Sequence, residues 1–233
     1  MKMGTFALHL HEQLMLLALR DEKGTLESRA SMYGYALGGA ILSELTLGGN
    51  IQIASDKKKM VDLVDRTMLG EPVLDECLDL VASAKRRRQA SSWVGRFARL
   101  KKLRHRVAEG LCRRGILQDS EDKVLLFFSR KIYPTINPEP ERQLIESLRK
   151  AVFGESETVK PESAIVVSLA NATGLLAIHF DKKKLKERKR RLEQIANGDL
   201  AGAATREAVQ AAQQAAMAAV IAATAVTTIT AAH

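Results

Sequence analysis

Cysteine is scarce in this chain of 233 residues, which lacks the pattern of a disulfide-rich scaffold. The two cysteines, Cys77 and Cys112, lie far apart and form no C-x-x-C pair. Because both lie among apolar residues, we expect buried free thiols and a reducing, cytoplasmic compartment. His9 and His11 could share a face, but no third ligand lies near them in the sequence. We therefore predict no metal site and no cofactor.

Aromatic residues and strongly apolar runs are also scarce. Aromatics make up 4% of the chain, and Trp93 is the one tryptophan. Residues 215–232 carry no charge, but they are mostly Ala and Thr, which is weakly apolar for a membrane span of about 20 residues. We instead expect an Ala-rich helix, at about residues 201–232, that packs in the core.

The motifs of several enzyme classes are missing from the sequence. It has no Walker loop, no G-x-G-x-x-G after a strand and no G-x-S-x-G elbow. We predict that the chain is not an enzyme. Lys and Arg instead outnumber Asp and Glu by 36 to 27, for a net charge of +9. Such a surplus favours an anionic partner: phospholipid, nucleic acid or an acidic protein.

Helical periodicity dominates the hydrophobic pattern. We predict a mostly α fold in which residues 1–233 form a single globular domain of packed helices with short β-hairpins. Residues 51–53 and 60–63 alternate like a hairpin, and residues 124–128 resemble a buried strand. The expected helices include residues 31–47, whose small side chains would let another helix come very close; these are Gly34, Ala36, Gly38, Gly39 and Ala40.

The most one-sided stretch runs from Lys85 to Arg114, where Glu109 is the one acidic residue. We expect a helix over about residues 98–114, on which Lys101 and Arg104 are three apart and so are neighbours. Such a pair can hold a phosphate, with Arg as a planar fork and Lys as a point charge. The supporting basic surface would consist of Arg86, Arg87, Arg88, Arg99 and Lys102. The alternative is a solvated basic face. A second basic run, residues 182–191, leaves the same two interpretations open.

Five segments, in the same order, resemble the Golgi phosphoprotein 3 family. They are residues 8–24, residues 40–51, residues 70–76, residues 104–117 and residues 167–172. The Ala-rich ending resembles the bacterial members of that family. The resemblance implies a mostly helical domain that binds membranes peripherally through phosphatidylinositol 4-phosphate. It also implies, for eukaryotic members, binding to the tails of glycosyltransferases.

The resemblance also implies a head-group pocket. The family's pair of cations falls on Lys101 and Arg104, its tryptophan near Arg29 and its helix arginine near Gly38. Half of the pocket is therefore kept and half is altered. We expect a peripheral membrane protein at the cytosolic face of a membrane, with an anionic lipid as its partner and membrane-protein tails as further partners. The alternative is a basic helical nucleic-acid-binding protein, which the scarcity of aromatics disfavours. The sequence leaves the oligomeric state open.

Overall fold

The computed structural model describes residues 7–19, 33–124, 128–202, 206–207 and 209–213. In chain order, the helices are α1 (Leu10–Ala18), α2 (Tyr33–Leu47), α3 (Pro72–Ala82), α4 (Ala90–Ala98), α5 (Leu103–Arg113), α6 (Glu139–Phe153), α7 (Pro161–Ala172), α8 (Leu176–His179), α9 (Lys182–Glu187) and α10 (Lys189–Ala196). The strands are β1 (Ile51–Ile53), β2 (Met60–Leu63), β3 (Arg88–Gln89), β4 (Ser120–Val124) and β5 (Phe128–Ile132). The mostly α fold class is confirmed.

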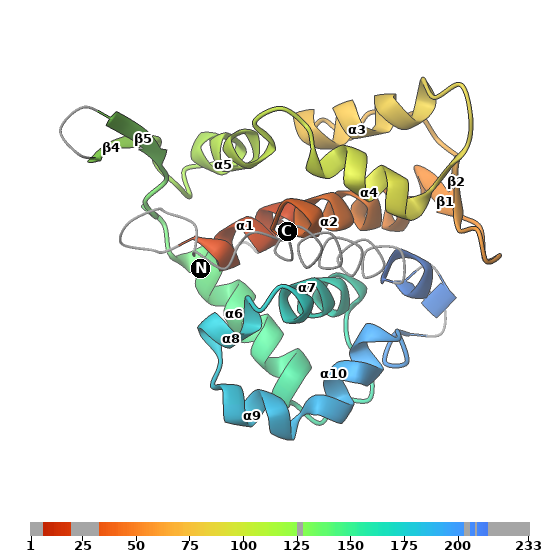
Figure 1. Ribbon diagram of the computed structural model, residues 1–233. Helices are drawn as coiled ribbons and strands as arrows, with labels where there is room; N and C mark the ends of the chain where they lie inside the picture. The colour runs from red at the N-terminus through yellow and green to blue at the C-terminus, as the bar shows by residue number, and fades with distance from the viewer. Residues whose placement is uncertain (1–6, 20–32, 125–127, 203–205, 208, 214–233) are drawn as a thin grey trace, which may run out of the picture.

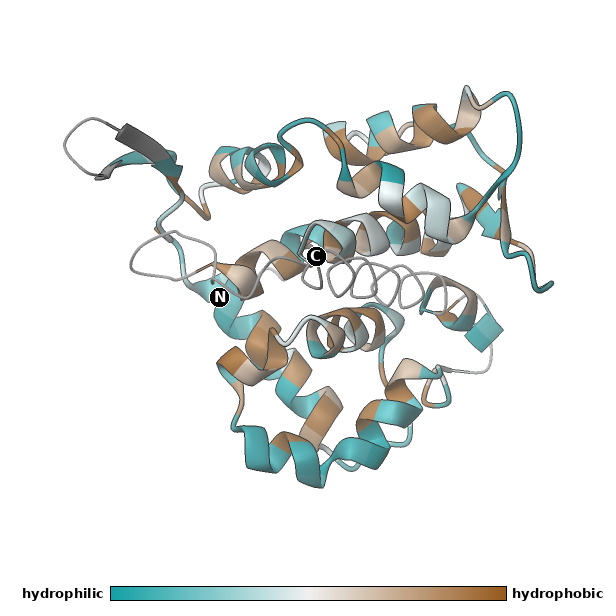
Figure 2. Cartoon of the chain, viewed as in Figure 1, coloured by the Kyte–Doolittle hydropathy of each residue, from teal (hydrophilic) through white to brown (hydrophobic). Residues whose placement is uncertain are grey.

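Helices α1 and α2 lie in the middle of the molecule (Figure 1). Helices α3, α4 and α5 cover them on one side, and α6 to α10 lie on the other. The sequences of α2 and α7 are apolar or small nearly all round, and most of their residues are buried. A helix without a polar face is stable only when it is enclosed, which explains their central position. Helices α9 and α10, by contrast, are mostly hydrophilic (Figure 2).

Two small antiparallel sheets complete the described fold. The predicted hairpin is confirmed: β1 pairs with β2, and Ile53 lies opposite Val61. Strand β3 adds to the other edge of β2, with Val61 opposite Arg88. The second sheet, β4–β5, is a hairpin that extends away from the helices (Figure 1). The expectation of one buried strand over residues 124–128 is wrong, because Val124 ends β4 and Phe128 begins β5. A short apolar run does not reveal where a chain turns.

The helix predicted over about residues 98–114 is present as α5, but it begins at Leu103 rather than near residue 98. Helix α4 ends at Ala98, and α5 begins at Leu103 after a four-residue turn. The two helices bury their apolar sides against different partners, α4 on α2 and α5 on α1 and α3. The chain therefore changes direction between them, and Lys102 adopts a left-handed conformation with φ 55° to do so. Residues 182–196 are likewise split, into α9 and α10 at Arg188.

Other expectations have mixed outcomes. Both cysteines are free thiols, but only Cys77 is buried, whereas Cys112 on α5 is partly exposed. Most of the expected Ala-rich helix, residues 214–232, lies outside the described residues. The single domain over residues 1–233 stays a prediction. No helix in the described residues is long and apolar enough to cross a membrane.

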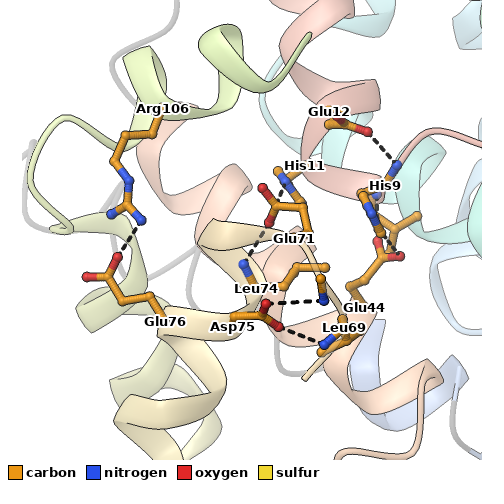
Figure 3. A network of polar contacts seen from close by, with 12 residues as sticks. His9, His11, Glu12, Glu44, Leu69, Glu71, Leu74, Asp75, Glu76 and Arg106 are labelled. Atoms are coloured by element: carbon orange, nitrogen blue, oxygen red, sulfur yellow. Dashed lines mark hydrogen bonds and ion pairs between the residues drawn. The ribbon is translucent and has the colours of Figure 1, made fainter. Parts of the chain in front are cut away.

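A polar network joins the starts of α1 and α3 to α2 and α5 (Figure 3). The backbone N–H of Leu10 donates to Glu44 at 2.6 Å, and His9 Nδ1 lies 3.1 Å from the same carboxylate. Glu71 caps α3 by accepting from the N–H of Leu74 at 2.7 Å. On the side of α5, Arg106 forms an ion pair with Glu76. These contacts tie the start of α1 to α2, and α3 to α5.

Candidate functional site

The cations between α3 and the end of α5 fall into two groups. Three form ion pairs: Arg87 with Asp62, Arg106 with Glu76, and Arg114 with Glu12. The second group has no carboxylate within ion-pair distance in the described part of the chain; it consists of Lys85, Arg86, Arg88, Arg96, Arg99, Lys101, Lys102, Arg104 and Arg113. Every member of this second group is exposed. Because its charges are not neutralised within the protein, this group can attract an anion.

The turn between α4 and α5 holds the densest part of the second group. Arg99, Lys101 and Lys102 lie in this turn, and Arg104 lies in the first helical turn of α5. The predicted pair, Lys101 and Arg104, therefore does not share one helix edge. Both side chains are exposed at the same end of α5, where no acidic residue occupies the first turn.

Arg104 is held in place by an aromatic ring. Its guanidinium carbon lies 5.6 Å from the centre of the Tyr33 ring, at the start of α2. Tyr33 is buried, and its hydroxyl donates to Met15 Sδ at 3.2 Å. Burial raises the pKa of this tyrosine well above 10, so the hydroxyl stays protonated. A cation on a fixed ring loses less conformational freedom on binding an anion, which favours binding at this position.

Arg96 gives a second example of this arrangement on the outer face of α4. Its guanidinium carbon lies 5.2 Å from the centre of the Trp93 ring, and that ring is buried. Neither aromatic residue was predicted as a site residue from the sequence. Arg96 and Trp93 are three apart, a spacing that could have suggested the contact. Tyr33 and Arg104 belong to different helices, and no local pattern signals that pair.

The two altered positions of the implied pocket have different outcomes. Arg29 lies outside the described residues. Gly38 is buried in α2, where a Cβ atom would lie 2.5 Å from the carbonyl oxygen of Val94. Helix α4 therefore covers this position with its backbone, as the small residues of α2 predicted. We leave Gly38 out of the proposed site, because its backbone faces α4.

The conformation of Lys102 gives a test of the turn. A left-handed residue other than glycine is strained by about 1–2 kcal/mol. Glycine removes this strain, but its greater loss of conformational entropy on folding offsets part of the gain. We expect Lys102→Gly to raise the free energy of unfolding by roughly 0.5–1 kcal/mol in urea denaturation. Lys101→Gly removes the same charge from a residue without a left-handed φ, and it is expected to lower stability instead. A loss of stability in both variants would contradict the turn geometry.

No group of three or more metal-ligating side chains within the described residues could hold a metal ion. His11 lies inside α1 next to His9, with the two rings stacked at 5.6 Å. His105 Nδ1 lies 2.9 Å from the hydroxyl of Tyr133, and His179 Nε2 lies 2.8 Å from the carbonyl oxygen of Leu17. These histidines therefore belong to the packing and hydrogen bonding of the fold.

Comparison with known proteins identifies the family. The model of the Golgi phosphoprotein 3 (GPP34) family matches residues 10–212. The chain belongs to the Golgi phosphoprotein 3 family. The match covers all the described helices, including the α4–α5 turn and its cations.

Two curated relatives are fungal proteins, each named vacuolar protein sorting-associated protein 74. The one from Schizosaccharomyces pombe is 29% identical over 164 residues, covering 62% of this chain and 47% of the relative. The one from Eremothecium gossypii is 30% identical over 139 residues, covering 52% of this chain and 42% of the relative. The aligned part spans less than half the length of these relatives.

Proposed function

We propose that this member of the Golgi phosphoprotein 3 family is a peripheral membrane protein that binds anionic lipid head groups at the α4–α5 turn. Lys101 and Arg104 would contact the phosphate, with Arg86, Arg88, Arg99 and Lys102 as the supporting basic surface. The observation that carries this proposal is the cluster of exposed cations without carboxylate partners, one of which is fixed on the buried Tyr33 ring. Arg87 contributes less, because Asp62 already pairs with it.

Family membership supports a phosphoinositide, of the phosphatidylinositol 4-phosphate type, as the head group. The names of the two fungal relatives point to protein sorting, and membrane-protein tails are therefore proposed as further partners. We place the protein at the cytosolic face of a membrane and propose no catalytic activity for it. The second candidate, nucleic acid, would use the same cations, but the aromatic rings that accompany them, Trp93 and Tyr33, are buried and cannot stack bases.

Vesicle flotation of paired variants tests the site. Each cation near an anionic surface contributes about 1 kcal/mol, so replacing both Lys101 and Arg104 with Ala is expected to weaken vesicle binding by up to roughly 30-fold. The matched control is Lys182→Ala with Lys183→Ala on α9, which removes the same charge on the other side of α1 and α2. Both lysines are exposed and have no ion pair in the described part of the chain. Arg114 is unsuitable for a control, because its loss would leave the buried Glu12 without its ion-pair partner.

The outcomes separate a site from general electrostatic attraction. Equal losses in the two double variants would mean that binding is diffuse, and retention of a DNA fragment rather than of vesicles at physiological salt would favour the nucleic-acid alternative. Vesicles that contain phosphatidylserine at matched charge are expected to compete measurably with phosphatidylinositol 4-phosphate. A preference of a hundredfold or more, about 2.7 kcal/mol, would show that other residues have rebuilt a specific pocket.

A further inference from the structure

Exposed apolar side chains gather in one short segment between β2 and α3. Five large hydrophobic residues are exposed in the described part of the chain, and three of them are Leu63 (40% exposed), Val64 (61%) and Met68 (53%). The other two, Ile136 and Ile178, occur singly elsewhere. Scattered exposed apolar residues are ordinary, but three within six positions form a local patch.

Hydrogen bonds hold this segment in a fixed shape. The backbone N–H groups of Val64 and Asp65 both donate to the carbonyl oxygen of Asn50, at 2.9 and 3.1 Å. At the other end, the N–H groups of Leu69 and Gly70 donate to the carboxylate of Asp75 in α3, at 2.7 and 3.1 Å. The backbone is therefore anchored at both ends of residues 64–70, while the side chains of Leu63, Val64 and Met68 remain in solvent.

Cations on β3 and in the chain before it lie next to β2, the strand that leads into the patch. Strand β3 pairs with β2 so that Arg88 is opposite Val61, two residues before Leu63. Arg87 forms an ion pair with Asp62, the residue that precedes Leu63. The chain reaches β3 through Lys85 and Arg86, which are exposed and have no carboxylate partner within the described residues. An apolar patch with cations at its border is the arrangement that fits the boundary between lipid head groups and acyl chains.

Helix α4 connects this patch to the head-group site. It begins directly after β3 and ends just before the α4–α5 turn, and its nine residues span about 13 Å. Ser92 and Arg96 are exposed at a spacing of four, which places them on one face of the helix, and Arg99 follows directly after its last residue. Exposed cations thus stand before α4 at Arg88, within it at Arg96 and after it at Arg99 and Lys101.

We propose that Leu63, Val64 and Met68 insert into an anionic bilayer, with the exposed face of α4 that carries Arg96 lying against the head groups. This inference rests on the proposed function and adds to it an orientation of the protein on the membrane. A lipid surface fits better than a protein partner because three side chains fall far short of the roughly 1,200 Å² that a stable protein interface buries. The neighbouring cations supply the charge complementarity that an anionic bilayer requires.

A fluorescent probe on the patch tests the insertion. Val64→Cys, in a Cys112→Ser background and with Cys77 buried, would be labelled with nitrobenzoxadiazole. On phosphatidylcholine vesicles that contain roughly 30 mol% phosphatidylserine, a strongly anionic surface, the emission of the probe is expected to move to shorter wavelength. The matched control is Ile178→Cys on α8, whose residue is as exposed as Leu63 but lies on the other side of α1 and α2 (Figure 1).

A second pair of variants measures the contribution to affinity. Leu63→Ser with Val64→Ser is expected to weaken binding to the same vesicles roughly tenfold. The remaining binding should become more sensitive to salt, because only the electrostatic part is left. Ile178→Ser is expected to change neither quantity. Circular dichroism of each variant would establish that it is folded.

Each outcome decides one of the two proposals. Bound protein whose Val64 probe keeps its aqueous emission would overturn the insertion and leave the head-group site standing, and so would an equal shift at Ile178. A Val64 shift that appears without vesicles as protein concentration rises would assign the patch to contacts between copies of the chain and overturn the insertion. Failure of the unmodified chain to bind any anionic vesicle would overturn the head-group site and the insertion together.

Discussion

Gly38→Ala is expected to destabilise the protein by about 3 kcal/mol, because the new methyl group would overlap the backbone of α4. The added Cβ would lie 2.5 Å from the carbonyl oxygen of Val94 and 3.1 Å from the amide nitrogen of Ala98. Both are backbone atoms of a helix that packs against α2 over its length, so neither can yield without moving all of α4. For a chain of this size, such a loss corresponds to a melting temperature lower by roughly 6–12 °C.

Gly34→Ala is the matched control for this prediction. Gly34 lies one turn earlier on α2, where a Cβ atom would meet the carbonyl oxygen of Ala98 at 3.6 Å, an ordinary contact distance. Because Ala is the better helix former by about 1 kcal/mol, this variant is expected to be neutral or slightly more stable. Equal melting temperatures for the two variants would mean that α4 does not approach Gly38 closely. If α4 moves, the turn that carries Lys101 moves with it, so Gly38→Ala should also weaken vesicle binding.

Several elements could be predicted from the sequence because their signals are local. The hairpin of β1 and β2 follows from alternation on either side of a polar turn. The start of α3 follows from Glu71-Pro72, and Glu71 does cap it. The small residues of α2 correctly indicated a close helix contact. The break between α4 and α5 was missed, because Leu100, Leu103 and Val107 continue at helical spacing across it and only the packing of α4 on α2 requires the turn.

The candidate site could be predicted only in part. The density of positive charge indicated the stretch that carries the exposed cations, but it did not show which of them are already paired. Arg106 and Arg114 find carboxylates on α3 and α1, which are distant in the sequence. The aromatic ring beneath Arg104 comes from α2, which is also distant in the sequence, so no local pattern signals this contact. The exposed patch of Leu63, Val64 and Met68 was likewise invisible, because β2 alone does not reveal which of its neighbours remain uncovered.

His11 is the most costly buried group in the described polar network. It is buried in α1, and neither ring nitrogen has a hydrogen-bond partner. The nearest carboxylate oxygen is that of Glu71, 3.6 Å from Nε2, which is too far for a hydrogen bond. Burial, with a smaller contribution in the same direction from the neighbouring His9, lowers the pKa of His11 to about 3. The fold therefore holds this histidine in its neutral form.

The pKa of His9 is shifted in the opposite direction to that of His11. Its hydrogen bond to Glu44 raises the pKa of His9 above 6.5, against the opposing effect of its own partial burial. The stability that this contact contributes is fully present below pH 6.5 and is lost as the pH rises through the raised pKa. His9→Gln is expected to remove this loss as the pH rises, but to keep most of the acid dependence of His11, because burial is the larger cause of the low pKa of His11. This variant is therefore the control for His11.

His11→Leu is expected to remove a large part of the acid sensitivity of the fold. In the unfolded chain His11 takes up a proton near pH 6.5, whereas in the folded chain it does so only near pH 3. The stability contributed by its neutral form is therefore complete above pH 6.5 and falls by up to about 1.4 kcal/mol for each pH unit below it. Between pH 6.5 and pH 4 the loss amounts to about 3 kcal/mol. Leucine has a similar volume and leaves no polar atom unpaired, so the variant is expected to match or exceed the original stability at pH 7. Urea denaturation of both proteins at half-unit steps from pH 7 to pH 4.5 measures the difference between their free energies of unfolding. The carboxylates are common to both proteins, so their contributions cancel in this difference. A difference that stays constant over this range would show that His11 is not held neutral by burial.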